Sequence, residues 1–292
     1  DFNQDYIGED VKSTIEAVKQ FNENLDPTTL DLGNSGTGIR LLSGYIAGSG
    51  KDCTLIGDKS LSQRPMNRIA EPLNSWGAEV SLKEQKFPPI EIKGTKLLPE
   101  FTYNLTIPSA QIKSCLLLAA LSSKTKITIF ENIPSRDHTE RMLEECGADI
   151  KRDGNKIILD GSIEIKKKFI DVPKDFSSAA YLIAANILSK KDILLEGVGV
   201  NSTRTAFLDV VKEMGGNVVL KNLENITNEP RADIASNAKQ ELKGISIQGK
   251  KIPNLIDEIP LIAIMGLFAR GQTTVRDAKE LRFKESDRIS LL

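Results

Sequence analysis

Residues suited to binding an anion lie in a glycine-rich stretch near the start of the chain, at 31–40. Its three glycines and small polar residues lead directly into an apolar run at 41–47. This pattern predicts a turn that opens a helix, whose first N–H groups have no partner within the helix and face a ligand. Glycine lets an anion approach the backbone closely, the helix dipole favours its negative charge, and Arg40 could add a cation with fork geometry. A flexible loop that only caps an ordinary helix would show the same local pattern.

Polar residues of the same kind recur at matching places further along the chain. They open helix-like segments at 34–37, 109–111, 175–178 and 257–258, and they fill polar loops at 64–68, 135–138, 201–204 and 284–288. If these segments are related by pseudo-symmetry, several helix N-termini and several arginines face one region. Such a region suits a pair of anionic substrates that carry phosphates and carboxylates.

Each of these residues also has a purely structural explanation. Arg64 could mark a capped helix start, and residues 284–288 could be an i, i+4 pattern on a solvated surface. Three others could be plain N-caps of the helices that they precede: Ser109, Ser177 and Asp257. Their recurrence at matching places favours a functional site.

The composition excludes several classes of function. A formal net charge of −1 argues against a nucleic-acid-binding surface, and the longest apolar run, 261–269, is far shorter than the ~20 residues of a membrane span. No signal peptide opens the chain, and its three cysteines lack Cys-x-x-Cys spacing, so we expect reduced thiols and a cytoplasmic protein. The single histidine, His138, rules out a multi-histidine metal site and argues against a histidine triad, so acid–base chemistry must come mainly from carboxylates, lysines or arginine-tuned groups.

An internal repeat must position these residues. A Gly-small pair ends a helix at Gly77, Gly147 and Gly215, which stand 70 and 68 residues apart. Before each such helix the repeat predicts a buried helix rich in small residues and then a strand. The helices are expected at 35–47, 109–121, 177–188 and 257–269, and the strands at 52–56, 126–130, 192–196 and 272–275.

The length of 292 residues and the repeat together predict two α/β domains. We place the boundary after a charge run at 166–168, which gives a first domain at 1–172 and a second at 173–292. The polar stretch 222–239, which contains the breaker Glu229-Pro230, is expected to be a loop.

Five motifs, in this order, resemble the 3-phosphoshikimate 1-carboxyvinyltransferase (EPSP synthase) family. They are Leu32-Gly-Asn-Ser-Gly-Thr-Gly-Ile-Arg40, Gly57-Asp-x-Ser-Leu-x-x-Arg-Pro-Met66, Ser109-Ala-Gln111, Ser135-Arg-Asp-His138 and Leu281-Arg-x-Lys-Glu-Ser-Asp-Arg288. The resemblance implies the enolpyruvyl transferase fold, a two-domain inside-out α/β barrel built from repeated βαβαββ units. It also implies transfer of the enolpyruvyl group of phosphoenolpyruvate to the 5-hydroxyl of shikimate 3-phosphate, with release of phosphate. The implied enzyme belongs to the shikimate pathway of aromatic amino-acid biosynthesis, is a monomer, and needs no metal or other cofactor.

The family's residue roles carry over onto the matching positions. Two carboxylates are implied to be catalytic: Asp257 takes the proton of the attacking hydroxyl, and Glu285 relays a proton at the methylene carbon. The phosphoenolpyruvate side is implied to include Asn34, Gly36, Thr37, Arg64 and Arg288. The shikimate 3-phosphate side is implied to include Ser109, Ala110, Ser135 and Lys284, while Gln111 contacts both substrates. Ala110 stands where the family often has a second serine. Glyphosate occupies the phosphoenolpyruvate site in this family, so the implied enzyme is a glyphosate target.

Two other functions stay open at this point. UDP-N-acetylglucosamine enolpyruvyl transferase shares the fold and chemistry, but it usually carries a reactive cysteine in a mobile loop, where none of the three cysteines here is expected. The other is a non-catalytic binding module of the same fold, against which the intact Asp257, Glu285, Arg64 and Arg288 argue. The family's opening Lys-Ser-x-x-x-Arg segment and its closing Arg- and Lys-bearing segment are missing, so we expect a piece of a longer enzyme that is inactive alone.

Overall fold

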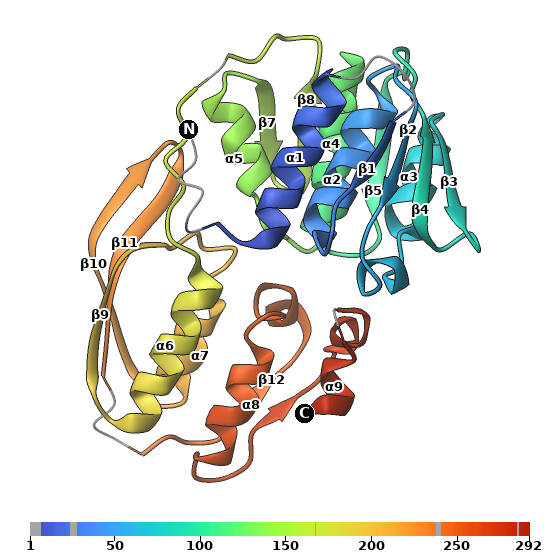
Figure 1. Cartoon of the computed structure of the whole chain (residues 1–292). Helices are drawn as coiled ribbons and strands as arrows, with labels where there is room; N and C mark the ends of the chain where they lie inside the picture. Colours follow the sequence, from blue (N-terminus) through green and yellow to red (C-terminus); the bar gives the residue numbers. More distant parts are fainter. Residues whose placement is uncertain (1–6, 24–27, 167, 238–240, 285) are drawn as a thin grey trace. The chain divides into compact units, whose positions relative to one another are not determined.

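A computed structural model describes residues 7–23, 28–166, 168–237, 241–284 and 286–292 (Figure 1). The chain divides into two compact units. Unit 1 comprises Asp1–Asn132 and Gly147–Lys166, and unit 2 comprises Ile133–Cys146 and Lys167–Leu292. The division expected from the sequence is a single cut after residue 172, whereas here the segment Ile133–Cys146 groups with unit 2. The domain limits 1–172 and 173–292 therefore stay a prediction.

Unit 1 contains two four-stranded sheets of the same topology, β1-β2-β4-β3 and β5-β6-β8-β7. The first sheet consists of β1 (Thr28–Asp31), β2 (Cys53–Ile56), β3 (Glu79–Lys83) and β4 (Phe87–Lys93), and the second of β5 (Phe101–Leu105), β6 (Lys126–Glu131), β7 (Asp149–Asp153) and β8 (Lys156–Asp160). In each sheet the first two strands are parallel and the other neighbours antiparallel. A parallel pair needs a crossover connection and an antiparallel pair only a turn, so this shared topology confirms the repeat.

Among the described residues of unit 1, these strands are connected or covered by α1 (Glu9–Glu23), α2 (Gly36–Ala47), η2 (Leu61–Gln63), α3 (Asn67–Trp76) and α4 (Ala110–Ser123). The helices expected at 35–47 and 109–121 are confirmed as α2 and α4, which pack side by side (Figure 1). Where they cross, a Cβ on Gly44 would overlap the backbone carbonyl of Cys115, so only glycine allows this close approach.

Unit 2 begins with α5 (His138–Glu145) and continues with α6 (Phe176–Ser189), β9 (Asp192–Gly199), α7 (Ala206–Glu213), β10 (Asn217–Ile226) and β11 (Glu229–Asn237). After these come β12 (Ser246–Ile247), η3 (Gly249–Asn254), α8 (Ile259–Leu267), β13 (Thr274–Val275), η4 (Lys279–Phe283) and α9 (Arg288–Leu291). Strands β10, β11 and β9 form an antiparallel sheet, and β12 pairs with β13 in parallel. The core of this unit gathers apolar residues of α6, α7 and α8, among them Ile183, Phe207 and Ile262.

The marker glycines lie where the repeat predicts them. Gly77, Gly147 and Gly215 each follow a helix and have φ values of +106°, +83° and +100°. Residues with a side chain rarely adopt this left-handed conformation, which ends a helix without strain only for glycine.

The prediction of a loop at 222–239 is wrong for the described residues, and 238–239 lie outside them. Residues 222–226 belong to β10 and residues 229–237 form β11, and the two strands pair from Asn217↔Asn237 to Ile226↔Glu229. The turn between the strands consists of Thr227 and Asn228, with φ values of +48° and +61°. A two-residue turn with both φ values positive matches the twist of a hairpin, and Pro230 is tolerated near the start of its strand. The polar composition reflects exposure, because β10 is exposed along most of its length.

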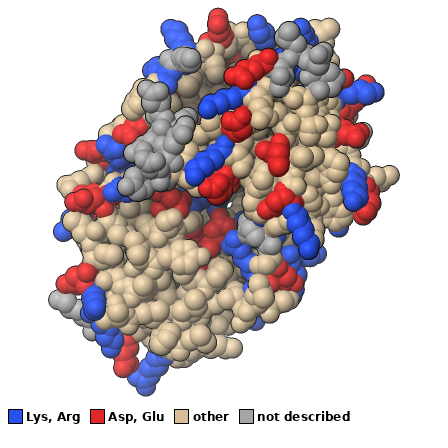
Figure 2. Space-filling model, in the orientation of Figure 1, with Lys and Arg blue, Asp and Glu red and all other residues tan. Residues whose placement is uncertain are grey.

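Charged residues of both signs are mixed over the face of the molecule drawn in Figure 2. The same view shows a wide area without charged side chains over α6 and α8 of unit 2, which agrees with the exposed Tyr181, Leu182 and Leu267. Within the ranges described above, no helix is long and apolar enough to cross a membrane.

Candidate functional site

The glycine-rich stretch of unit 1 forms the turn that the sequence predicts. The carboxylate of Asp31 accepts a hydrogen bond from the Gly33 N–H at 2.9 Å, and Gly33 has a φ of +53°. The hydroxyl of Ser35 then caps α2 by accepting from the Gly38 N–H at 3.1 Å. Because Ser35 holds the backbone in this conformation, the first turn of α2 is fixed.

Arg64 lies against this first turn. It follows η2, is 8% exposed, and donates from Nη2 to the Asn34 side-chain oxygen at 2.5 Å. The Asn34 amide in turn donates to Asp58 at 2.7 Å. This hydrogen bond, together with the one from the Leu61 N–H, lowers the pKa of Asp58, which is therefore ionised near neutral pH. The three side chains form a chain that holds the Arg64 guanidinium in place.

A second arginine and Gln111 complete this cluster. Arg40 is 6% exposed and donates to the Gly36 carbonyl at 2.9 Å and to the Gln111 side-chain oxygen at 3.2 Å. The Gln111 amide donates to the Thr37 hydroxyl at 2.9 Å. A Cβ on Gly36 would lie 2.7 Å from Arg64 Nη1 and 3.2 Å from Arg40 Nη1, so both guanidiniums meet the helix start at its glycine. The structure thus brings together five of the expected residues: Asn34, Gly36, Thr37, Arg64 and Gln111.

The start of α4 carries Ser109 and Ala110. Ser109 is the N-cap, because its hydroxyl accepts from the Ile112 N–H at 3.4 Å, and Ala110 is the first helical residue. Both residues are half-buried. The N-cap explanation and a binding role are compatible for Ser109, since a serine hydroxyl can accept and donate at once.

In unit 2, three cations surround Asp257. Its carboxylate accepts hydrogen bonds from Arg136 Nη2 and from Lys284 Nζ, the latter at 3.0 Å, and Arg288 Nη1 lies 3.7 Å away. Burial raises the pKa of Asp257, but the Arg136 and Lys284 charges and hydrogen bonds outweigh this and hold the pKa well below its ordinary value. Helix α8 begins at Ile259, after Glu258, so Asp257 does not act as the N-cap.

Arg136 is a residue that the sequence reasoning missed. Only Ser135 of its motif was expected in a site, and Ser135 is 5% exposed and groups with unit 2. The signal was present, because Arg136 stands in the second polar loop of its repeat, as Arg64 does. Glu285, the expected proton relay, lies outside the described residues.

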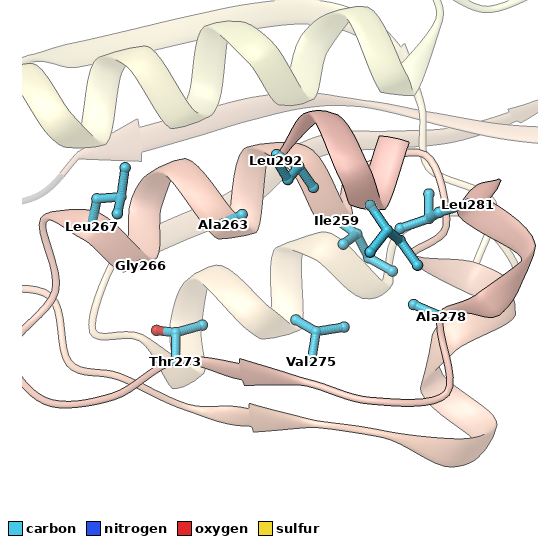
Figure 3. Close-up of a pocket in the computed structure, with 10 residues that line it drawn as sticks. Ile259, Ala263, Gly266, Leu267, Thr273, Val275, Ala278, Leu281 and Leu292 are labelled. Carbon is cyan, nitrogen blue, oxygen red and sulfur yellow. The ribbon is translucent and has the colours of Figure 1, made fainter. Parts of the chain in front are cut away.

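Neither the cysteines nor an apolar pocket adds to these clusters. In the described part of the chain, no group of three or more His, Cys, Asp or Glu side chains could hold a metal ion. Unit 2 has an apolar pocket of about 360 Å³ (Figure 3), and Thr273 is polar among side chains that are otherwise apolar. Its lining residues are Ile259, Ala263, Gly266, Leu267, Thr273, Val275, Ala278, Leu281, Ile289 and Leu292. None of the expected site residues lines it, and it offers no cation to an anionic substrate.

Comparisons with known proteins agree with the motifs. A family model of EPSP synthase (3-phosphoshikimate 1-carboxyvinyltransferase) matches residues 4–292. A 3-phosphoshikimate 1-carboxyvinyltransferase of Thermoanaerobacter sp. (strain X514) is 42% identical over 98% of this chain and 72% of the relative. The enzyme of the same name from Ruthia magnifica subsp. Calyptogena magnifica is 47% identical over 91% of this chain and 61% of the relative.

Solved structures show the same fold. An EPSP synthase from Acinetobacter baumannii superimposes with a TM-score of 0.82 at 39% identity, over 98% of this chain and 69% of that chain. The enolpyruvyl transferase NikO from Streptomyces tendae has a TM-score of 0.64 at 16% identity, over 82% of this chain and 56% of that chain, which shows the fold alone. The expected enolpyruvyl transferase fold is therefore confirmed. With its motifs in order and a family model matched along nearly its whole length, the chain belongs to the EPSP synthase family.

Proposed function

We propose that the protein transfers the enolpyruvyl group of phosphoenolpyruvate to the 5-hydroxyl of shikimate 3-phosphate and releases phosphate. The observation that carries this proposal is the ionised carboxylate of Asp257 among Arg136, Lys284 and Arg288. A base beside several cations suits a reaction between two anions, in which a hydroxyl must lose its proton.

The phosphoenolpyruvate side is proposed at the start of α2. The start of a helix favours an anion through its dipole and its first N–H groups, and Arg64 lies against Gly36 at this helix start. Asn34 holds Arg64, and Gln111 reaches the same place from α4. Arg288 of unit 2 is proposed as the second arginine that binds this substrate. Two guanidiniums suit its phosphate and its carboxylate, since each accepts bidentate hydrogen bonds.

The shikimate 3-phosphate side is proposed to use Ser109, Ala110, Ser135 and Lys284. We add Arg136 to this set, because it shares Asp257 with Lys284. Ala110 lacks a hydroxyl, so it can offer only its backbone N–H.

The chemistry assigns a proton transfer to each carboxylate. Asp257 takes the proton of the 5-hydroxyl while the hydroxyl oxygen bonds to C2 of phosphoenolpyruvate. Glu285 delivers a proton to the methylene carbon C3. Loss of a proton from C3 and of phosphate from C2 then restores the double bond, with Arg64 stabilising the departing phosphate. The low pKa of Asp257 suits a base only after an anionic substrate has drawn Arg136 and Lys284 away from it.

The alternative acceptor, UDP-N-acetylglucosamine, is not favoured. Its transferase usually carries a reactive cysteine in a mobile loop, whereas Cys146 ends helix α5 and burial raises the pKa of Cys53 to about 11 and that of Cys115 to about 12. Thiols with pKa values as high as those of Cys53 and Cys115 are structural. A monomeric state, a cytoplasmic location and domains at 1–172 and 173–292 are further parts of the proposal.

The proposal is tested by phosphate release from the intact protein. Release is expected when phosphoenolpyruvate and shikimate 3-phosphate are both present, and not with either substrate alone. Release with UDP-N-acetylglucosamine in place of shikimate 3-phosphate would favour the alternative, and no release with any acceptor would favour a binding module.

A further inference from the structure

The polar loop at 201–204 matches the Arg64 loop in the repeat, but the proposed reaction gives it no role. Its arginine, Arg204, lies between β9 and α7, and its side chain is 14% exposed. Arg204 Nη2 donates to the Ser177 hydroxyl at 2.7 Å. That hydroxyl lies 2.6 Å from Glu258 Oε1, and Glu258 is 2% exposed.

The direction of these hydrogen bonds follows from the donors. A guanidinium only donates, so the Ser177 oxygen accepts from Arg204. The single hydrogen of Ser177 then points to Glu258 Oε1, which accepts it. This chain joins three separate pieces of unit 2: the loop before α7, the first turn of α6, and the residue next to Asp257.

Charged groups face this chain from several elements. Burial and the neighbouring Arg136 lower the pKa of Arg204, while Glu258, Asp175 and Asp257 act in the opposite direction. For Glu258, burial raises the pKa, Asp257 raises it further, and the Ser177 hydrogen bond, Arg204 and Arg136 act in the opposite direction. Arg204 and Arg136 thus offset part of the burial of Glu258, whose pKa stays above its ordinary value.

Unit 1 shows the same relation with a different outcome. There Arg64 donates to Asn34 before α2, and its other nitrogen lies against the buried Gly36. In unit 2, Arg204 donates to a serine that is itself bonded to a buried carboxyl. Arg204 therefore connects through a serine to a buried carboxyl, whereas Arg64 connects to the Asn34 amide at the start of α2.

We propose that Arg204 is a positioning residue for Asp257: by holding Ser177 against Glu258, it fixes the direction in which the adjacent Asp257 faces Arg136 and Lys284. The effect on catalysis rests on the proposed function, which makes Asp257 the base. The contact of Arg204 with Ser177 and Glu258 does not depend on that function.

The kinetic test compares Arg204→Gln and Ser177→Ala with Arg231→Gln in the intact protein. Arg231 is a matched control, since it is a partly exposed arginine of unit 2 that pairs with Asp171 and Glu224. A displacement of about 1 Å in a reacting group costs up to about 100-fold in rate. We expect kcat to fall about tenfold or more in both test variants, with KM for phosphoenolpyruvate within about twofold of wild type. Arg204→Lys, which keeps a charged donor, should recover part of kcat, and Arg231→Gln should change neither constant.

A second readout needs no activity. With ¹³C-labelled glutamate and no substrate, the pKa of Glu258 should rise in Arg204→Gln and in Ser177→Ala, and stay unchanged in Arg231→Gln. The proposal is overturned if folded Arg204→Gln keeps the wild-type kcat, if it raises KM for shikimate 3-phosphate with kcat unchanged, or if the Glu258 titration does not move. If the wild-type protein releases no phosphate, the proposed function fails and the link to catalysis fails with it, while the titration still decides the contact.

Discussion

Adding a single methyl group at Gly36 tests whether Arg64 binds phosphoenolpyruvate. In Gly36→Ala, the new Cβ would lie 2.7 Å from Arg64 Nη1, whereas ordinary contacts begin at 3.4 Å. The guanidinium must therefore withdraw by about 0.7 Å. The atoms that must move are the ends of two flexible side chains, Arg64 and Arg40, so the fold should tolerate the change and the effect should fall on the ligand.

The size of the effect follows from the contact that is disturbed. A hydrogen bond to a charged group is worth about 1.5–3 kcal/mol, which corresponds to about 10- to 150-fold in affinity. Because Arg64 is displaced rather than removed, we expect the lower end: KM for phosphoenolpyruvate should rise about tenfold. Inhibition by glyphosate, which shares this site in the family, should weaken by at least the same factor.

The assay is the initial rate of phosphate release at fixed shikimate 3-phosphate and varied phosphoenolpyruvate, with and without glyphosate. Ser60→Ala is the control, because it removes only a long hydrogen bond to Arg64, at 3.5 Å, and adds no atom beside α2. A folded Gly36→Ala protein with KM and glyphosate inhibition within twofold of wild type would refute the placement of the substrate over Gly36.

Three further predictions concern Asp257 and the buried ion pair of unit 1. Asp257→Asn should lower kcat by about 100-fold or more, and an unchanged kcat at unchanged Tm would show that Asp257 is not the base. The pKa of Asp257 lies below its ordinary value of 3.8, so its ionised form stabilises the folded state at neutral pH and this contribution is lost as the pH falls below about 4. The Tm advantage of wild type over Asp257→Asn should therefore shrink from about pH 5 to about pH 3 in calorimetry. If the Tm of both proteins changed with pH in parallel, the ion pairs of Asp257 would be contradicted. Lys113 is 0% exposed and lies 3.1 Å from Glu131 Oε2, which also accepts from the partly exposed Arg152 at 3.1 Å. Lys113→Met therefore leaves Glu131 with Arg152 as a cation and should cost less unfolding free energy than the roughly 3–5 kcal/mol of a fully uncompensated buried charge. Lys113→Met/Glu131→Leu should be less damaging in denaturant titrations, and a double variant worse than the single one would argue against this explanation.

Much of the fold could be predicted from the sequence because the repeat carries it. The glycines at 77, 147 and 215 mark helix ends through a backbone requirement that no other residue meets easily. Small residues such as Gly44 mark helices that approach one another. The hairpin at 217–237 is not evident in the sequence because its turn, Thr227-Asn228, contains no glycine and its first strand, β10, is polar and exposed along most of its length. Whether a polar stretch is a loop or an exposed strand depends on its burial, which the sequence alone does not give.

The site could be predicted as a set of residues, but not as a set of contacts. The motifs pointed to Asn34, Arg64 and Gln111, which the structure brings together. The pairing of Arg136 with Asp257 joins residues 121 positions apart, and such a pairing depends on tertiary structure. It also gives Asp257 a pKa that its neighbours in the sequence would not suggest.

The close approach of Gly44 to the Cys115 carbonyl fixes how α2 lies against α4, and so where the glycine-rich turn before α2 is held. Gly36 precedes Gly44 by about two helical turns, which is roughly 12 Å along α2. A tilt of only about 5° about the crossing would carry the Gly36 amide by about 1 Å, a displacement that can cost about 100-fold in rate. Gly→Ala changes inside helices are a common route to greater stability. At Gly44, however, the added carbon would overlap the Cys115 carbonyl and push α2 away from α4. Gly44 therefore controls the position of Gly36 although it lies outside the proposed site. Substitutions at Gly44 should lower activity more than substitutions at most surface residues near Gly36.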